Sequence, residues 1–391
     1  MNTILDVNRA RMETPASSHL IHFNNAGASL IPVPVQRAVA AYQDAEYNLG
    51  GYETYDRHIA DHKAVYDKIA ELINGHSEEI ILTSSASHSY GIALQSLRLK
   101  PGDKVLCCYA EYISNYMALL LQKKQGVEIV LVPNDSNGQI DLDALDKSID
   151  GRTKLISLTH IPTSNGLINP AEEVGRIAKR NGVIYLLDAC QSVGQIQVDV
   201  AAIGCDLLAA TGRKYLRGPR GTGFLYVKKN LLPRMEPPIV DGWGGDWTAL
   251  NDFQYRDGRS RLELFEKNYA ALLGLGTAAE YAATWGMKNI EERNCFLANK
   301  LREALVAVKG VKVRDPGVRR GGIVTFTMAG KDHAAVIQDL RKKKMHVSLS
   351  SGVSARLDLG MRGIESVLRA SIHYYNTEEE IERFVSTIKS I

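Results

Sequence analysis

From about residue 79, short apolar runs alternate along the chain with segments of helical periodicity. The apolar runs are EIILT (79–83), KVLCC (104–108), VEIVLV (127–132), KLISLT (154–159), VIYLLD (183–188), DLLAA (206–210) and GFLYV (223–227). Helices are predicted at about 33–47, 55–73, 112–125 and 170–181. Strands that are apolar throughout and separated by helices are typical of a mostly parallel sheet covered on both faces. The pattern therefore predicts a large α/β domain.

The pattern changes after residue 232. Residues 233–247 are rich in Pro, Gly and Trp, which predicts an irregular crossing segment. Beyond it we predict helices at 260–285, 290–308, 333–343 and 377–390, and strands at 323–328, 345–350 and 367–373. We therefore divide the chain into an N-terminal arm (1–32), a large α/β domain (33–260) and a small C-terminal α+β domain (261–391). The N-terminal helices are expected to pack across both domains.

Composition and charge narrow the class of protein. The chain has 391 residues and a net charge of +3, which gives no broad positive field, so we expect no nucleic-acid partner. We find no apolar run typical of a signal peptide and none long enough to cross a membrane. The five cysteines show neither CxxC spacing nor an even count, and most lie in apolar segments. We expect a cytoplasmic protein with reduced cysteines.

Three strand ends carry polar residues that suit one ligand. TSSASHS (83–89) ends a strand and opens a helix, so its backbone N–H groups could hold an anion, although a serine cap is also common there. Asp188 ends a very apolar strand, and Gln191 follows it. A carboxylate in this place can cap a helix or pair with a protonated heterocyclic nitrogen.

TGRKYLRGPRGTG (211–223) follows the next predicted strand and contains Lys214 between cations. Neighbouring positive charge disfavours the charged form of a lysine, which suits Schiff-base chemistry. Thr211 and Arg213 supply a hydroxyl and a cation for a phosphate. An acid for a pyridinium, a lysine for an aldehyde and an anion cradle together fit pyridoxal phosphate.

With DACQ and TGRKYLRGPRGTGFLYV, the chain resembles the class V aminotransferase superfamily of fold-type I pyridoxal-phosphate enzymes. The resemblance runs from HFNNAGAS (22–29) to VLRASIHYYNTEEEIERF (367–384). It implies a mostly parallel seven-stranded sheet and a homodimer. GGY (50–52), RKYLRGPRG (213–221) and RLELFEKNYAALLGLG (261–276) look most similar to hercynylcysteine sulfoxide lyases, a branch related to isopenicillin-N epimerase-like proteins.

The resemblance also implies a role for each matching residue. Lys214 would form the Schiff base, Asp188 would pair with the pyridine nitrogen, and Gln191 would contact the ring hydroxyl oxygen. The phosphate would be held by Ala86, Ser87, Thr211 and Arg213. Tyr112 stands where many relatives stack a histidine on the ring. Arg369 would bind the substrate carboxylate as a bidentate fork.

Three further residues are predicted near the substrate. Asn25 lies in the matching segment HFNNAGAS. Trp243 and Trp247 could belong to the core or could line the pocket of a partner subunit. We predict no metal site: His58 and His62 have helical spacing, but no third ligand and no HExxH glutamate accompany them.

The expected reaction is carbon–sulfur β-lysis of an S-substituted L-cysteine or its sulfoxide, through an aldimine and a Cα carbanion. Transamination and epimerisation would use the same residues, and a non-catalytic regulator that binds pyridoxal phosphate is a further alternative. A persulfide-forming desulfurase is not expected. Desulfurases keep a cysteine before the carboxylate arginine, whereas SLSSGVSARLDLGMRG (348–363) contains none.

Overall fold

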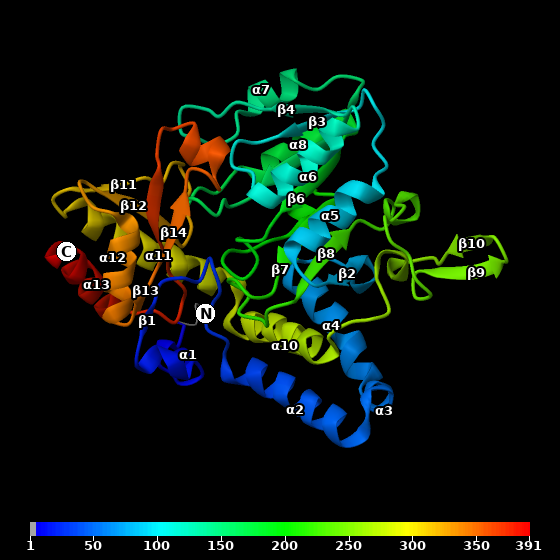
Figure 1. The fold of residues 1–391 in the computed structure, drawn as a ribbon, viewed down its shortest axis with the longest axis horizontal. Helices are drawn as coiled ribbons and strands as arrows, with labels where there is room; N and C mark the ends of the chain where they lie inside the picture. Colours follow the sequence, from blue (N-terminus) through cyan, green and yellow to red (C-terminus); the bar gives the residue numbers. More distant parts are fainter. Residues whose placement is uncertain (1–4) are drawn as a thin grey trace.

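The computed structural model describes residues 5–391. Its largest element is a seven-stranded sheet in which β8 alone runs antiparallel to its neighbours (Figure 1). In spatial order its strands are β2 (Ile80–Thr83), β8 (Gly223–Val227), β7 (Leu207–Thr211), β6 (Ile184–Asp188), β5 (Thr153–Thr159), β3 (Lys104–Cys107) and β4 (Glu128–Leu131). The predicted α/β fold with a mostly parallel seven-stranded sheet is confirmed.

Side chains of opposite sheet faces enter two separate cores. Leu186 and Leu207 pack with helix α5 (Ala86–Ser96) and helix α6 (Ile113–Lys124). Leu187 and Leu208 point to the other face, where the core also takes in helices α4 (Ile59–Leu72), α8 (Ala171–Asn181) and α10 (Tyr269–Trp285). Because both faces are covered, the strands need apolar residues at every position, which explains their continuous apolar runs.

A four-stranded antiparallel sheet forms the centre of the C-terminal part. Its order is β11 (Val311–Val313), β12 (Ile323–Met328), β15 (Ser366–Ser371) and β14 (Ser348–Ser351). Helices α11 (Met287–Val306), α12 (His333–Lys342) and α13 (Glu378–Ser390) share its apolar core. The boundary at residue 261 remains a prediction, and the apolar residues of α10, which follows it, pack in the core of the large sheet.

The remaining elements are short or lie at the edge of the molecule. They are α1 (Val7–Met12), α2 (Val33–Leu49), α3 (Gly51–Arg57), α7 (Leu142–Lys147), α9 (Val200–Ile203), the β9–β10 hairpin (Gly245–Ala249 and Asp252–Tyr255) and the parallel pair β1–β13 (Ile21–His22 and Met345–His346). The hairpin projects from the body of the molecule (Figure 1).

Three predicted elements differ from the structure. The strand expected at 345–350 is two strands, because β13 pairs with β1 whereas β14 pairs with β15. The helix expected from residue 260 begins at Tyr269, where the Asn268 side chain caps it by accepting from Ala271 N–H. The segment expected to be irregular ends in the first strand of the β9–β10 hairpin.

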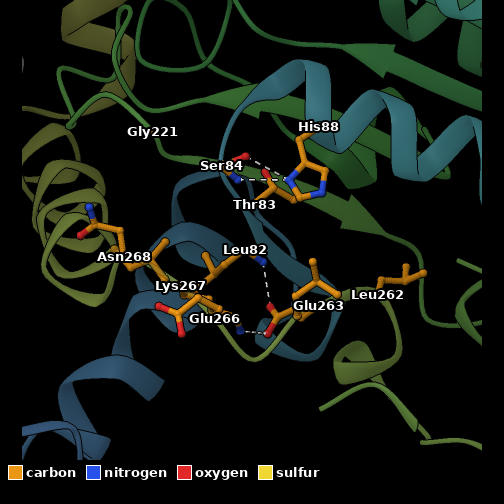
Figure 2. A pocket seen from close by; sticks show the side chains of 12 residues that line it. Leu82, Thr83, Ser84, His88, Gly221, Leu262, Glu263, Glu266, Lys267 and Asn268 are labelled. Carbon is orange, nitrogen blue, oxygen red and sulfur yellow. Dashed lines mark hydrogen bonds and ion pairs between the residues drawn. The ribbon is translucent and has the colours of Figure 1, made fainter. Parts of the chain in front are cut away.

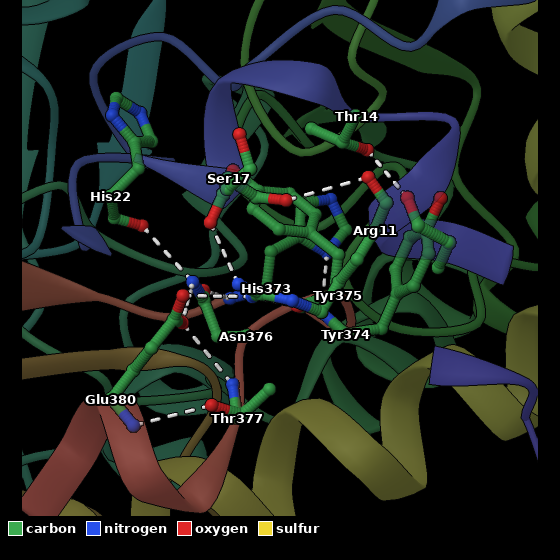
Figure 3. Close-up of polar contacts among 12 residues, drawn as sticks. Arg11, Thr14, Ser17, His22, His373, Tyr374, Tyr375, Asn376, Thr377 and Glu380 are labelled. Atoms are coloured by element: carbon green, nitrogen blue, oxygen red, sulfur yellow. Dashed lines mark hydrogen bonds and ion pairs between the residues drawn. The ribbon is translucent and has the colours of Figure 1, made fainter. Parts of the chain in front are cut away.

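The N-terminal arm is fastened to the C-terminal part by polar contacts (Figure 3). Arg11 Nη1 binds Glu380 Oε1 at 2.7 Å and the Tyr375 carbonyl at 3.1 Å. Glu380 also accepts from the Asn376 amide at 2.9 Å. These contacts hold the segment around Arg11 against the segment that follows β15.

Candidate active site

The carboxyl ends of β6 and β7 bring the two central predicted residues together. Asp188 is the last residue of β6, and Lys214 follows the end of β7 by three residues. Gly194, with φ +83°, lets the loop after Asp188 approach the loop that carries Lys214 (residues 212–222, the lysine loop) closely. A Cβ on Gly194 would lie 2.4 Å from Leu216 N and 2.5 Å from the Tyr215 carbonyl carbon, so a side chain there would push the loops apart.

Asp188 is a buried carboxylate with two hydrogen-bond donors. Its Oδ1 accepts from Cys190 N–H at 2.9 Å and its Oδ2 from Asn115 Nδ2 at 2.7 Å. Burial raises the pKa of Asp188, while the Cys190 N–H, the Lys214 charge and the Asn115 amide oppose the rise. A further cation at this place would favour the ionised form.

Lys214 is buried between a thiol and an aromatic ring. Its Nζ lies 3.2 Å from Cys190 Sγ and 5.7 Å from the ring centre of Tyr112, which precedes α6 as its N-cap residue. The amine, the carboxylate of Asp188 and the Tyr112 ring therefore face one space. This arrangement agrees with the predicted positions of a Schiff-base lysine, a pyridinium partner and a stacking ring.

The predicted phosphate residues lie at one edge of the sheet. Thr83 and Thr211 flank Gly223 in register, and the start of α5 follows Thr83. Ser85 caps that helix, so the N–H groups of Ala86 and Ser87 are at its free N-terminus. In this structure the Thr211 hydroxyl donates to the Thr222 carbonyl at 3.1 Å, and the Arg213 guanidinium donates to the Gly27 carbonyl.

Arg369 on β15 reaches the same site from the C-terminal sheet. Its Nη1 donates to Thr163 Oγ1 at 2.6 Å and its Nε to Ser348 Oγ at 2.9 Å. Thr163 Oγ1 also accepts from Gln191 Nε2 at 3.2 Å. One hydroxyl therefore links Arg369, the residue predicted to bind the substrate carboxylate, to Gln191, the residue predicted to contact the cofactor ring. Burial lowers the pKa of Arg369 to about 10, which still leaves the guanidinium charged at neutral pH.

The residues present fit pyridoxal phosphate. Gln191 Oε1 is buried and has no hydrogen-bond partner among residues 5–391, as expected for an atom that would meet a ring substituent. Asp188 would hold the ring nitrogen, Lys214 the aldehyde carbon, and the start of α5 with Thr211 and Arg213 the phosphate.

The three remaining predicted residues lie apart from this cluster or are already bonded. Asn25 is fully buried; its amide donates to the Ser371 and His22 carbonyls, and its oxygen accepts from Tyr375. Trp243 is partly buried beside Lys267. Trp247 lies on the β9–β10 hairpin and is 79% exposed. Their predicted contacts with substrate remain predictions.

A cavity of about 290 Å³ opens beside the start of α5. Figure 2 shows Thr83, Ser84 and His88 on one side and Glu263, Glu266 and Lys267 on the other. Ser84 lies within 3.1 Å of His88 Nδ1, and Glu263 accepts from Leu82 N–H at 2.8 Å. The cavity thus adjoins the predicted phosphate residues, and its lining contains both acidic side chains (Glu263 and Glu266) and a basic one (Lys267).

Two general properties bear on the predicted partners. Within residues 5–391 no group of three or more His, Cys, Asp or Glu side chains could hold a metal ion. His62 instead packs against the Tyr55 ring, with 5.1 Å between ring centres. Over the same range no helix has the length and apolarity needed to cross a membrane.

Comparison with known families places this site. The chain matches the family described as Aminotransferase class-V over residues 21–384, which include every predicted site residue. The chain belongs to the class-V aminotransferase family. As a member of it, the protein is a pyridoxal-phosphate enzyme, and the predictions of the family, the fold and the cofactor are confirmed.

Similar proteins carry the name cysteine desulfurase. A probable cysteine desulfurase of Methanothermobacter thermautotrophicus is 30% identical over 389 residues, 97% of each chain. A cysteine desulfurase of Serratia proteamaculans is 30% identical over 341 residues, 84% of this chain and 82% of its own. The solved apo structure of cysteine desulfurase from Thermococcus onnurineus has a TM-score of 0.92 at 27% identity, covering 100% of this chain and 98% of that one.

These names leave the finer assignment to one branch of the family as a prediction. They do not single out the sulfoxide-lyase and epimerase-like branch to which the sequence was assigned. A solved complex of a cystine C–S lyase with its product cysteine persulfide has a TM-score of 0.86 and covers 97% of this chain and 99% of its own. Because its identity is 21%, that likeness shows the fold alone.

Sequence reasoning missed residues that the fold brings into the class-V site. Thr163 follows β5 at the same sheet edge as Asp188, so its position after a strand was a usable signal. Asn115 binds Asp188 from helix α6, 73 residues away in the sequence, and no spacing along the chain indicates that contact. Cys190 contacts Lys214 from the loop after β6, a contact that its position two residues after Asp188 did not reveal.

Proposed function

We propose that this class-V enzyme is a carbon–sulfur lyase that acts on an S-substituted L-cysteine or its sulfoxide. Arg369 would bind the substrate carboxylate, since its charged group faces the site near Lys214 and Tyr112. Lys214 would take the Cα proton, and Asp188 would stay ionised beside the ring nitrogen. When bound, pyridoxal phosphate supplies the electron sink for this proton removal.

The observation that carries the proposal is that no cysteine lies in the segment before Arg369, and that four of the five cysteines lie elsewhere in the molecule, away from Lys214. Cys107, Cys108 and Cys205 are buried, and Cys295 donates to the Arg320 carbonyl on another part of the molecule. The segment after Ser348 contains serines and no thiol. A mobile thiolate that could receive sulfur is therefore missing where a desulfurase of this family keeps it.

Sulfur would then leave on a fragment of the substrate. The Cα–H proton passes to Lys214, and the Cβ–S bond breaks with its electron pair on sulfur, which leaves as a thiolate or sulfenate and is protonated. Water converts the remaining 2-aminoacrylate to pyruvate and ammonia. An acidic leaving group departs more readily, so sulfoxides and aryl thioethers should react faster than free cysteine.

Desulfuration of cysteine is the second candidate. It is favoured by the names of the similar proteins and by Cys190, whose Sγ lies 3.2 Å from Lys214 Nζ. In that reaction Cys190 would be the only thiol at the site able to accept sulfur, because it is the only cysteine that contacts Lys214 within residues 5–391.

Product analysis distinguishes these reactions. Purified protein loaded with pyridoxal phosphate would be given S-substituted cysteines, their sulfoxides, cysteine and ordinary amino acids. Pyruvate and ammonia in equal amounts support the lyase, a keto acid without ammonia supports transamination, and loss of optical activity alone supports epimerisation. No turnover of any of these compounds would instead favour a regulator that only binds the cofactor.

Variants make the experiment specific for sulfur. Replacing all five cysteines by alanine or serine, or Cys190 alone by alanine, should leave pyruvate formation from S-substituted cysteines largely intact. Lys214→Ala should abolish it and serves as the inactive control. A persulfide found on Cys190 during turnover, lost in Cys190→Ala together with activity, would overturn the lyase proposal in favour of desulfuration.

A further inference from the structure

A second carboxyl lies buried behind Asp188. Glu111 precedes α6 and accepts from Ser157 Oγ at 2.8 Å and from Thr159 Oγ1 at 3.2 Å. Both donors are on β5, and Thr159 pairs with Asp188 in register across to β6. Glu111 is therefore bound to β5, the strand next to β6, which carries Asp188.

One amide links them. Asn115 Nδ2 donates to Asp188 Oδ2 at 2.7 Å, and the Asn115 side chain is also near enough to Glu111 to lower the pKa of that carboxyl. Glu111 and Asn115 are four residues apart, one turn across the start of α6. We therefore expect a change at Glu111 to reach Asp188 through the Asn115 side chain.

The charges around Glu111 leave one proton on the pair. Besides Asp188, the titratable groups that face Glu111 are Tyr90 on α5 and Cys107 and Cys108 at β3. Burial raises the pKa of each of these three groups, so all are neutral and none offsets a second negative charge. Lys214 faces Asp188 instead. Two buried carboxyls that interact do not both ionise readily.

We propose that Glu111 is a positioning residue for Asp188. Glu111 holds the single proton that the two carboxyls share, and it orients Asp188 through Asn115. Asp188 is then the ionised member, directed at the cofactor ring nitrogen. The proposal concerns the cofactor site and holds for either candidate reaction, because both use the same ring. Its failure would therefore leave the choice between lyase and desulfurase untouched.

The first test is the pH dependence of unfolding of the full-length chain without cofactor. Burial and the Asp188 charge raise the pKa of Glu111 from 4.5 to about 7 in the folded protein. Between pH 4.5 and 7, Glu111 thus keeps a proton in the folded chain that it loses in the unfolded chain, so the contribution of Glu111 to stability falls as the pH rises. The stabilisation contributed by protonated Glu111 is fully present below pH 4.5 and is lost as the pH rises through about 7.

Glu111→Gln should remove this contribution, so that its stability changes more positively with rising pH than that of wild type, since the amide keeps the shape and cannot titrate. Glu79→Gln is the matched control: Glu79 is also buried, accepts from Lys229 N–H at 2.9 Å and lies outside the site, so its variant should keep the wild-type slope. An unchanged slope in Glu111→Gln would overturn the proposal.

The second test is cofactor affinity, measured by equilibrium binding of pyridoxal phosphate at pH 6.5. Glu111→Gln should bind within about threefold of wild type, whereas Glu111→Ala, which frees Asn115, should bind about tenfold or more weakly. Wild-type affinity in a folded Glu111→Ala protein would contradict the positioning role. Should that variant fail to fold, the pH slope of Glu111→Gln decides alone.

Discussion

Arg369 is a buried guanidinium, and no acidic side chain within residues 5–391 pairs with it. Its hydrogen bonds go to the hydroxyls of Thr163 and Ser348 and to the Thr163 carbonyl, all of them neutral groups. Its Nη2 donates to no residue between 5 and 391. This nitrogen is also not among the fully buried atoms that lack a partner, so it is accessible to a ligand. A buried cation of this kind is costly unless an anion approaches it, and the free nitrogen gives a carboxylate a place to bind.

Arg369→Lys should therefore weaken binding of amino-acid substrates. A point charge replaces a planar fork, and losing one charge-assisted hydrogen bond costs about 1.5–3 kcal/mol, or roughly 10–150-fold in kcat/KM. Steady-state kinetics with an amino acid and its amide test this, since the amide should lose little more. Arg341→Lys, on an exposed residue, is the control. Equal losses for acid and amide would place Arg369 outside the carboxylate site.

The sequence predicts some residues of the site better than others. Asp188 and Lys214 follow apolar strands, and such positions point to a common sheet edge before any coordinate is known. Asn115, Thr163 and Glu111 bind their partners across 73, 28 and 46 residues of sequence, respectively. Their roles depend on which helix covers which strand, so neither spacing nor residue type reveals them.

At the scale of the elements, strands buried on both faces were predicted closely. The expected 183–188 and 206–210 correspond to Ile184–Asp188 and Leu207–Thr211, because continuous apolar residues leave little choice of structure. The expected single strand at 345–350 failed because β13 and β14 choose different partners, which depends on distant residues. The β9–β10 hairpin was missed because Trp247 and Leu250 are exposed and show no alternation.

That hairpin exposes large apolar side chains far from the core. Leu250 is 83% exposed and Trp247 79%, and Phe253 lies on the opposite strand. Such a patch is typical of an interaction site, and we expect a second copy of this chain to cover it in the predicted homodimer.

The double substitution Trp247→Glu and Leu250→Glu should weaken this dimer at least about tenfold, because burying each large apolar side chain contributes about 1.5–3 kcal/mol. Sedimentation equilibrium of the purified protein measures the dissociation constant. Val318→Glu, also at an exposed apolar residue, should leave it unchanged. A wild-type monomer, or equal dimerisation of all three proteins, would rule out the hairpin as the interface.

At the scale of the whole molecule, one arginine joins three regions. Arg217 is 1% exposed and adopts φ +61°, three residues after Lys214. It donates to the Leu30 carbonyl at 3.0 Å and to the Tyr374 hydroxyl at 2.7 Å, and it also binds Thr14. The N-terminal arm, the lysine loop and the segment after β15 therefore meet on one side chain, which also keeps a strained backbone in place.

Arg217→Ala should consequently lower the free energy of unfolding by about 2–4 kcal/mol, since it leaves buried groups of the arm and of the C-terminal segment without a donor. Arg220→Ala provides a matched control in the same loop, because Arg220 is exposed and should change stability by less than about 0.5 kcal/mol. Urea unfolding followed by circular dichroism measures both. The arm should also become more cleavable by protease in Arg217→Ala, because the hydrogen bonds from Arg217 to Thr14 and Leu30 are lost. Equal unfolding midpoints for the two variants would show that Arg217 does not hold these regions together, and other contacts of the arm, such as Arg11 with Glu380, would then be sufficient.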